Sequence, residues 1–337
     1  MKVCHGVEEI AGQGYYSVYG LNLIGINSKE LLWYNNKFTY DISGEFSKCY
    51  GINKRKSRIF VTCVNLIRLF KDALKFDCFH FHFAQSLWPY NLDLWLLKKL
   101  KKRLFFEFHG SELRGVYNDV KYKYYNPVNP NKKKLMKRID RCLKYADGVI
   151  LHDNELIPHL PSYYKGKVFI VPLRIEPSRF EINTKHDNLT KPIIVHAPSK
   201  RSTKGTEEIL KGLEPVKTEI ELILVENRTQ EEAKKIYEQA DIIIDQIAIG
   251  TYGVFCIEAM ALGKPVLSYI SDEMRASFPI DLPIISINPD NIIEKVRYLL
   301  DHPEERKRLG EKGIEYVKQN HDCKKIAEKL MTIYETQ

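Results

Sequence analysis

The chain has 337 residues, of which 44% are hydrophobic and 28% charged, so it has the composition of a globular protein and the length of two domains. No uncharged apolar run reaches about 18 residues, so a membrane-spanning helix is not expected. The net charge of +9 favours an anionic partner, which could be a phosphorylated small molecule, a nucleic acid or the anionic face of a membrane.

Seven cysteines are scattered along the chain without a CxxC pair, which argues against a zinc knuckle or a redox dithiol. The first residues lack the apolar stretch of a signal peptide. We therefore expect reduced, mostly buried thiols and a cytoplasmic protein.

The N-terminal half shows short apolar runs that alternate with helical patterns. A strand is expected over residues 1–4, followed by a turn at Gly12 and Gly14 and a helix. Further strands are predicted over 77–83, 104–108, 149–152 and 168–171, with a helix over 91–102. The stretch 34–58 is polar and irregular, and no element is predicted there.

The C-terminal half alternates more regularly. Strands are predicted over 192–197, 220–225, 241–245 and 265–269, separated by helices over 206–213, 230–239 and 253–262. Beyond residue 288 the pattern is wholly helical, over 291–300, 304–318 and 324–334. Buried strands joined by helices predict an α/β fold of two doubly wound, Rossmann-like domains that face each other across a cleft, where the carboxyl ends of the strands bind ligands.

The predicted domain boundaries follow from where this periodicity is lost. We expect an N-terminal domain over 1–172, a linker over 173–191 and a C-terminal domain over 192–318. The remaining residues, 319–337, form a helical segment that could pack back on the N-terminal domain.

A basic loop, residues 198–206, follows a predicted strand and opens a helix. Its backbone N–H groups, the positive end of the helix and the side chains of Arg201 and Lys204 could bind a diphosphate. The alternative is a solvated basic turn.

The segment from Gly250 to Glu258 combines a turn with an apolar helix. Gly253, between Tyr252 and Val254, would let a ligand approach the backbone at the start of the helix. Glu258 is a lone carboxylate on that helix, and burying it is costly without hydrogen bonds, which a ribose diol would supply. The alternative is a structural carboxylate bound by backbone amides.

Polar residues also follow a predicted strand in the N-terminal half, where His109, Glu112 and Arg114 lie close together. A histidine at the carboxyl end of a strand would point into the cleft, whereas the alternative is a loop or core histidine. The glycine-rich turn at Gly12 and Gly14 could let a substrate approach the backbone, but it lacks the third glycine of a dinucleotide-binding fingerprint.

His80 and His82 alternate on one predicted strand, so both point to the same face of the sheet. A metal site needs at least one more ligand, and none lies nearby in the sequence. We therefore expect no metal site and place His82 at the edge of the cleft.

Two basic segments lie in the N-terminal half, over 98–103 and 132–144. In the second, Leu135, Ile139 and Leu143 share one stripe of a helix. The stripe could pack on the domain core and leave the lysines as a solvated face, or the helix could rest on an anionic membrane.

Together these motifs resemble the retaining GT-B glycosyltransferases of the group-1 (family 4) type, most closely over 196–269 and 109–114. The resemblance implies that Arg201 and Lys204 bind the donor diphosphate, that Glu258 binds the donor ribose, and that His109 lies beside the transferred sugar. It also places Gly12, Gly14, Tyr252, Gly253 and Val254 around the donor, and His82, Glu112 and Arg114 on the acceptor side. In the family a first glutamate usually contacts the sugar, and here that place holds Gly250.

The resemblance implies sugar transfer from a nucleotide-sugar donor to a hydroxyl of a glycan, glycolipid or glycoprotein, with retention and with no metal or other cofactor. Such a protein would serve polysaccharide biosynthesis, in the cytoplasm or at the inner face of the plasma membrane, with a glycan or lipid-linked acceptor. The alternatives are a GT-B sugar-nucleotide epimerase and an inactive nucleotide-sugar-binding scaffold. A nucleic-acid partner is not expected, because no nucleic-acid-binding module is found.

Overall fold

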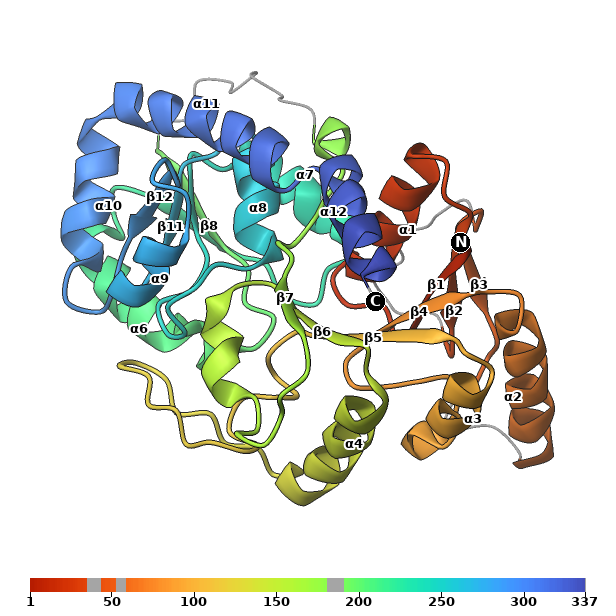
Figure 1. Ribbon diagram of the computed structural model, residues 1–337. Helices are drawn as coiled ribbons and strands as arrows, with labels where there is room; N and C mark the ends of the chain where they lie inside the picture. The colour runs from red at the N-terminus through yellow and green to blue at the C-terminus, as the bar shows by residue number, and fades with distance from the viewer. Residues whose placement is uncertain (35–43, 53–58, 181–190, 337) are drawn as a thin grey trace. The chain divides into compact units, whose positions relative to one another are not determined.

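The computed structural model describes residues 1–34, 44–52, 59–180 and 191–336, and the chain forms two compact units (Figure 1). Unit 1 consists of Met1–Val120, Pro127–Arg174 and Cys323–Gln337. Unit 2 consists of Lys121–Asn126 and Ile175–Asp322. The predicted linker spans the junction between Arg174 and Ile175, and its residues 181–190 lie outside the described part of the chain.

Unit 1 is built on a seven-stranded parallel sheet with the order β3-β2-β1-β4-β5-β6-β7. Its strands are β1 (Val3–Val7), β2 (Ser28–Leu32), β3 (Ser47–Cys49), β4 (Cys78–His82), β5 (Arg103–Phe108), β6 (Gly148–Leu151) and β7 (Val168–Ile170). Its α-helices are α1 (Gln13–Leu23), α2 (Ile59–Ala73), α3 (Leu94–Lys99), α4 (Lys132–Tyr145) and α12 (Cys323–Glu335).

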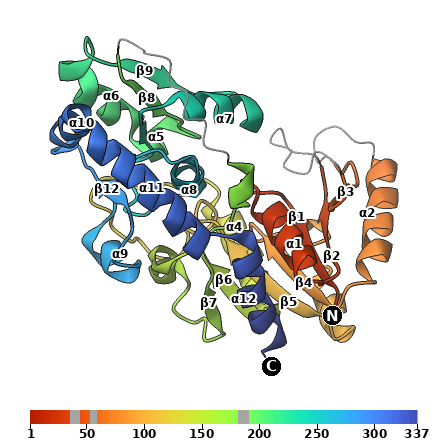
Figure 2. The ribbon, with the colours of Figure 1, turned by 90° about the horizontal axis from the view of Figure 1, so that it is seen from above.

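Helices cover both faces of this sheet. On one face α1 and α12 lie side by side (Figure 2), and Leu21, Leu330 and Tyr334 belong to one hydrophobic cluster. Gly20 permits this approach, because a Cβ at that position would lie 2.2 Å from the carbonyl oxygen of Cys323. Successive side chains of a strand point to opposite faces, so the alternate strand residues pack in a second cluster with α2, α3 and α4.

Unit 2 is built on a five-stranded parallel sheet with the order β12-β11-β10-β8-β9. Its strands are β8 (Ile193–His196), β9 (Glu221–Leu224), β10 (Ile242–Ile244), β11 (Val266–Ser268) and β12 (Ile284–Ser286). Its α-helices are α5 (Arg201–Lys204), α6 (Thr206–Leu213), α7 (Gln230–Gln239), α8 (Val254–Ala261), α9 (Asp272–Ser277), α10 (Ile292–Asp301) and α11 (Pro303–Asn320). Ile194 of β8 and Ile242 and Ile244 of β10 are buried against α6 and α10.

The predicted α/β class with parallel sheets is confirmed in both units, and the differences are local. The loop predicted over 198–206 contains the short helix α5, which Gly205 ends with a φ of +69°. The helix predicted over 91–102 shortens to α3, because Tyr90 and Asn91 adopt positive φ of +62° and +58° before it. The strands β2, β3 and β12 were not predicted, and β2 is largely polar.

None of the helices in the described ranges has both the length and the apolar character that crossing a bilayer requires.

Candidate functional site

Lys204 lies at the carboxyl edge of the sheet of unit 2. It ends α5, which follows β8, and its Nζ forms an ion pair with Asp245, which follows β10. The two residues meet because β8 and β10 are neighbours in the sheet. Asp245 is fully buried and also accepts a hydrogen bond from Cys256 Sγ at 3.1 Å. Lys204, which the sequence predicts to bind a diphosphate, therefore lies at this edge with its charge balanced by a buried carboxylate.

Arg201 begins the same helix and has different partners. Its guanidinium donates to Glu226 at 2.9 Å and to Glu207 at 3.0 Å, and its side chain is 43% exposed. Ion pairs this exposed contribute little to stability. The side chain can therefore exchange these partners for a phosphate without destabilising the unit.

Glu258 is the buried carboxylate on α8. Its Oε1 accepts a hydrogen bond of 3.2 Å from Gln230, the first residue of α7. Burial raises the pKa of Glu258 to about 7, and the Gln230 amide acts in the opposite direction. Near neutral pH the carboxyl group is thus divided between its two forms, and a ligand that donates hydrogen bonds to it would favour the ionised one.

The turn before α8 keeps its backbone open on one side. A Cβ on Gly253 would have no neighbour nearer than Asp245 Oδ2 at 4.0 Å, and Val254 is only half-buried. The side chain of Tyr252 is turned into unit 2, where its hydroxyl lies 3.2 Å from Tyr316 Oη and 3.1 Å from His321 Nε2. Tyr252 could therefore offer a ligand only its backbone.

Gly250 occupies the place where the glycosyltransferases that the sequence resembles usually have a glutamate. Its φ of +92° lies in the region that favours glycine, and a Cβ there would lie 3.1 Å from Ser271 Cβ. The backbone of this turn is thus built for a residue without a side chain.

His109, in unit 1, uses both ring nitrogens inside the protein. Its Nε2 lies 3.0 Å from His82 Nδ1, and its Nδ1 lies 2.9 Å from His152 Nε2. His82 is fully buried, which differs from the predicted position at the edge of a cleft, because it points to the face of the sheet that α1 and α12 cover. Burial lowers the pKa of all three histidines, so their rings are neutral at pH 7.

Glu112 and Arg114 position the segment that follows β5. Glu112 is buried, and its Oε1 accepts a hydrogen bond of 2.7 Å from the backbone N–H of His109. Burial raises the pKa of Glu112 to about 7. Arg114 donates two hydrogen bonds to Glu155, at 2.8 and 2.6 Å. Glu112 and Arg114, two of the three predicted acceptor-side residues, therefore bind to other groups of unit 1.

The presence of glycine at positions 12 and 14 is explained by the local structure of unit 1. Gly12 has a φ of +78° at the start of α1. A Cβ on Gly14 would lie 2.2 Å from Glu30 Oε1. The backbone conformation favours glycine at position 12, and Gly14 leaves room for the Glu30 carboxylate, whether or not a substrate approaches them.

In the part of the chain that the structure describes, two groups of side chains have ligand atoms within 4.8 Å of one another, close enough to share a metal ion: His5, His80 and His82, and His82, Glu107 and His109. The sequence offered no third ligand near His80 and His82, whereas the fold brings His5 from β1 and Glu107 from β5. The histidine nitrogens are hydrogen-bonded to one another, and Arg174 binds both oxygens of Glu107. The residues present thus fit a hydrogen-bonded network better than a metal site.

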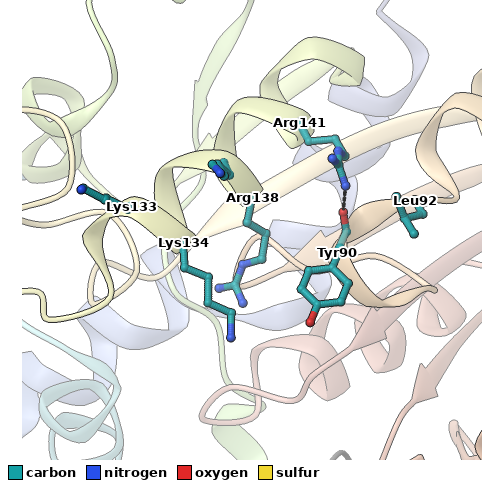
Figure 3. Close-up of a pocket in the computed structure, with 7 residues that line it drawn as sticks. Tyr90, Leu92, Lys133, Lys134, Arg138 and Arg141 are labelled. Atoms are coloured by element: carbon teal, nitrogen blue, oxygen red, sulfur yellow. Dashed lines mark hydrogen bonds between the residues drawn. The ribbon is translucent and has the colours of Figure 1, made fainter.

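A cavity of about 610 Å³ lies along α4 in unit 1, and all its charged lining residues are basic (Figure 3). Arg138 donates a hydrogen bond of 3.1 Å to the carbonyl of Phe83, the residue after β4, and Arg141 donates to the carbonyl of Tyr90. Figure 3 shows Lys134 and Arg138 pointing the same way beside Tyr90. The cavity is lined by Tyr90, Leu92, Lys133, Lys134, Lys137, Arg138 and Arg141.

Three buried charged residues around these sites were missed in the sequence. Asp245 ends the run 241–245 at the carboxyl end of a strand, and Glu107 interrupts the apolar run of β5, so both carried a signal as charges within or beside a predicted strand. Arg174 carried none, because it lies in an irregular segment and reaches Glu107 only through the fold.

Comparisons with known proteins agree with this architecture. Residues 223–332 match a family model for glycosyl transferase-like domains, whereas no curated protein sequence matches the chain significantly. HepE from Anabaena, solved with UDP and glucose, is similar with a TM-score of 0.73 at 10% identity over 100% of both chains. Sucrose-phosphate synthase from Thermosynechococcus elongatus has a TM-score of 0.69 at 14% identity and covers 99% of this chain and 98% of its own. A glycosyltransferase from Rickettsia africae has a TM-score of 0.68 at 16% identity, with coverages of 99% and 97%. The chain therefore has the GT-B fold, and its residues 223–332 resemble a glycosyl transferase-like domain.

Proposed function

We propose that this protein transfers a sugar from a nucleotide-sugar donor to a hydroxyl acceptor, with retention of configuration and without a metal ion. The observation that carries the proposal is Glu258, a buried carboxylate with a pKa of about 7 inside the glycosyl transferase-like segment. A ribose diol would donate hydrogen bonds to it and offset the cost of its ionisation. HepE has been solved with UDP-glucose, so UDP-glucose is the first donor to test.

Lys204 and Arg201 would stabilise the diphosphate that departs when the sugar leaves. Their pairing with Asp245, Glu226 and Glu207 holds both cations at the carboxyl edge of the sheet before a donor arrives. Charges held in advance stabilise developing charge without reorganisation. In this mechanism the departing phosphate oxygen accepts the proton of the acceptor hydroxyl, which attacks from the same face of the sugar.

We further propose that the acceptor is presented at an anionic membrane surface, and that the basic cavity along α4 binds its phosphate groups. Lys133, Lys134 and Lys137 are exposed there, and the side chains of Tyr90 and Leu92 are 68% and 51% exposed. Cations that surround exposed apolar side chains are typical of surfaces that contact lipid headgroups. This supports a lipid-linked acceptor over a freely soluble one.

The proposal is tested with a panel of nucleotide sugars, first by thermal shift and then by turnover. A donor that stabilises unit 2 and loses its sugar only when an acceptor is added supports a transferase, and the anomeric configuration of the product tests retention by NMR. Conversion of the donor without an acceptor would identify an epimerase instead. Tight binding with no turnover over a broad acceptor panel would identify an inactive binder.

A further inference from the structure

Six side chains of unit 1 form an unbroken chain of hydrogen bonds that includes His109. In order, this histidine chain consists of His80, Tyr334, His5, His82, His109 and His152. The distances between successive donor and acceptor atoms are 2.5, 3.3, 3.2, 3.0 and 2.9 Å. Each imidazole in the middle of the chain uses one nitrogen toward each neighbour. No nitrogen of these rings is shared between two of the bonds.

Both ends of the histidine chain meet the same carboxylate. His80 Nε2 lies 2.8 Å from Glu107 Oε2, and His152 Nδ1 lies 3.2 Å from Glu107 Oε1. These two approaches lie outside hydrogen-bond geometry, so His80 Nε2 and His152 Nδ1 are the free ends of the chain. Arg174 donates to both oxygens of Glu107, which keeps that carboxylate ionised and able only to accept.

The number of protons restricts the chain to two states. A neutral imidazole has one N–H donor and one bare nitrogen, and a tyrosine hydroxyl has one donor, so the six groups carry six protons. Five protons occupy the five hydrogen bonds, which must then all run in one direction, and the sixth proton lies at one end. Burial lowers the pKa of all five histidines, which keeps them neutral.

The contacts with Glu107 distinguish the two directions. An N–H facing an ionised oxygen is attractive, whereas a bare nitrogen facing it is repulsive, so the end that carries the proton lies closer. The His80 end lies at 2.8 Å and the His152 end at 3.2 Å, whereas His82 Nδ1, within the chain, lies farther from Glu107, at 3.5 Å, and so weighs less. The sixth proton therefore belongs on His80 Nε2, and every ring in the chain then carries its proton on Nε2.

We infer that the histidine chain fixes the tautomer and orientation of His109, with its Nε2–H donating to His82 and its Nδ1 accepting from His152. In this arrangement Tyr334, from the C-terminal helix α12, is a positioning residue, because its hydroxyl alone joins His80 on β4 to His5 on β1. The inference rests on the proposed function only where it assigns His109 a place beside the transferred sugar. The tautomers themselves do not depend on any activity.

The direct test is the state of the ring nitrogens in the full-length protein labelled with ¹⁵N-histidine. Long-range ¹H–¹⁵N correlation spectra at pH 7.5 separate Nε2–H, Nδ1–H and doubly protonated rings, and single histidine substitutions assign them. We expect His5, His80, His82, His109 and His152 all to be neutral Nε2–H tautomers. Nδ1–H in any of the five, or a mixture among them, would overturn the inference.

The role of Tyr334 is tested with Tyr334→Phe, which removes only the hydroxyl. The Nε2–H of His5 then loses its acceptor, so we expect the His109 ring to show both tautomers. We also expect kcat to fall by about tenfold with little change in the donor KM. A loss of this size is typical when a residue that orients an active group is removed. Tyr50→Phe is the matched control, because Tyr50 is also a buried tyrosine of unit 1 and its hydroxyl donates to a partner, Asp72, at 2.6 Å.

An unchanged His109 spectrum in folded Tyr334→Phe would remove Tyr334 from this role. If that variant does not fold, the spectrum of the unmodified protein still decides the direction of the chain. Absence of sugar transfer by the unmodified protein would contradict the proposed function while leaving the spectrum as the test of the inference.

Discussion

Arg174 and Glu107 form a two-pronged ion pair, with distances of 3.0 and 2.6 Å, in which both side chains are fully buried. Burial by itself would raise the pKa of Glu107, but the Arg174 guanidinium and the nearby His80 and His82 hold it well below its usual range. The last residue of the Pro127–Arg174 segment is thus joined to the centre of the unit 1 sheet.

Removing one partner of this pair leaves a buried charge without compensation. We expect Arg174→Met to lower the free energy of unfolding of unit 1 by about 3–5 kcal/mol, and a second change, Glu107→Leu, to recover part of the loss. Urea denaturation followed by tryptophan fluorescence measures this, because Trp33, Trp88 and Trp95 all lie in unit 1. The control Arg68→Met alters an exposed arginine. A loss below about 1 kcal/mol for Arg174→Met would contradict the prediction.

Acid should destabilise unit 1. The pKa values of the five histidines of the histidine chain are lowered in the folded state, so below about pH 6.5 the unfolded chain binds protons that the folded chain does not. Each such group lowers stability by up to about 1.4 kcal/mol per pH unit as the pH falls.

Glu112 and Asp93, whose pKa values burial raises to about 7 and about 6, and Glu9, whose pKa burial also raises, act in the opposite direction and add stability as the pH falls, but they are three groups against five. The urea midpoint by tryptophan fluorescence should therefore be clearly lower at pH 5.5 than at pH 7.5. Equal stability at the two pH values would show that the histidines are not held neutral.

Lys204→Ala should lower kcat/KM by about 10²-fold, the scale expected when one charge held in advance for the leaving group is lost. The matched control is Lys211→Ala, an exposed lysine on α6 in the same unit. Steady-state kinetics with the donor identified by thermal shift measures the effect. Near-normal activity of a folded Lys204→Ala protein would exclude Lys204 as a diphosphate ligand.

The affinity for a nucleoside diphosphate should depend on the ionisation of Glu258. Its pKa is raised to about 7, and a ribose diol favours the ionised form, so binding should weaken as the pH falls. Because of the ionisation of Glu258, calorimetry should show that UDP binds about tenfold more weakly at pH 6 than at pH 8.

Glu258→Gln should weaken UDP binding by about 1–3 kcal/mol at pH 8 and remove that part of the pH dependence. The exposed Glu231→Gln on α7 controls for the titration of the nucleotide itself. If both variants keep the affinity and pH dependence of the unmodified protein, Glu258 does not bind the ribose.

Binding to anionic vesicles should depend on the cavity along α4. Each lysine near an anionic surface contributes about 1 kcal/mol, so changing Lys133, Lys134 and Lys137 to Glu should weaken co-sedimentation with phosphatidylglycerol vesicles at least about tenfold. Binding should also fall with added salt, which screens exposed charges.

The control changes three exposed lysines elsewhere in unit 1 to Glu: Lys71, Lys165 and Lys325. Equal losses in the two triple variants would indicate a general effect of net charge. Equal recovery on neutral and anionic vesicles would favour a soluble acceptor, and competition by glycerol phosphate would indicate that the cavity binds free phosphates.

Much of the fold could be predicted from the sequence, because it depends on local patterns. The helices α6 and α7 begin and end where the apolar period predicts, at Thr206–Leu213 and Gln230–Gln239. Alternation of buried strands with helices predicts parallel sheets. The basic residues of α5 and α4 and the lone carboxylate on α8 could likewise be identified from the sequence, because residue types and their spacing are local features.

The partners of those residues were decided only by the tertiary structure. Lys204 is 41 residues from Asp245, and His80 is 254 residues from Tyr334, and no local pattern encodes a contact at such a separation. The same holds for His82, which was expected at an edge and is buried because α1 and α12 cover its face of the sheet. A period along the chain reports which side of an element is apolar, whereas the charge balance and hydrogen bonding of a buried polar group depend on which strands become neighbours.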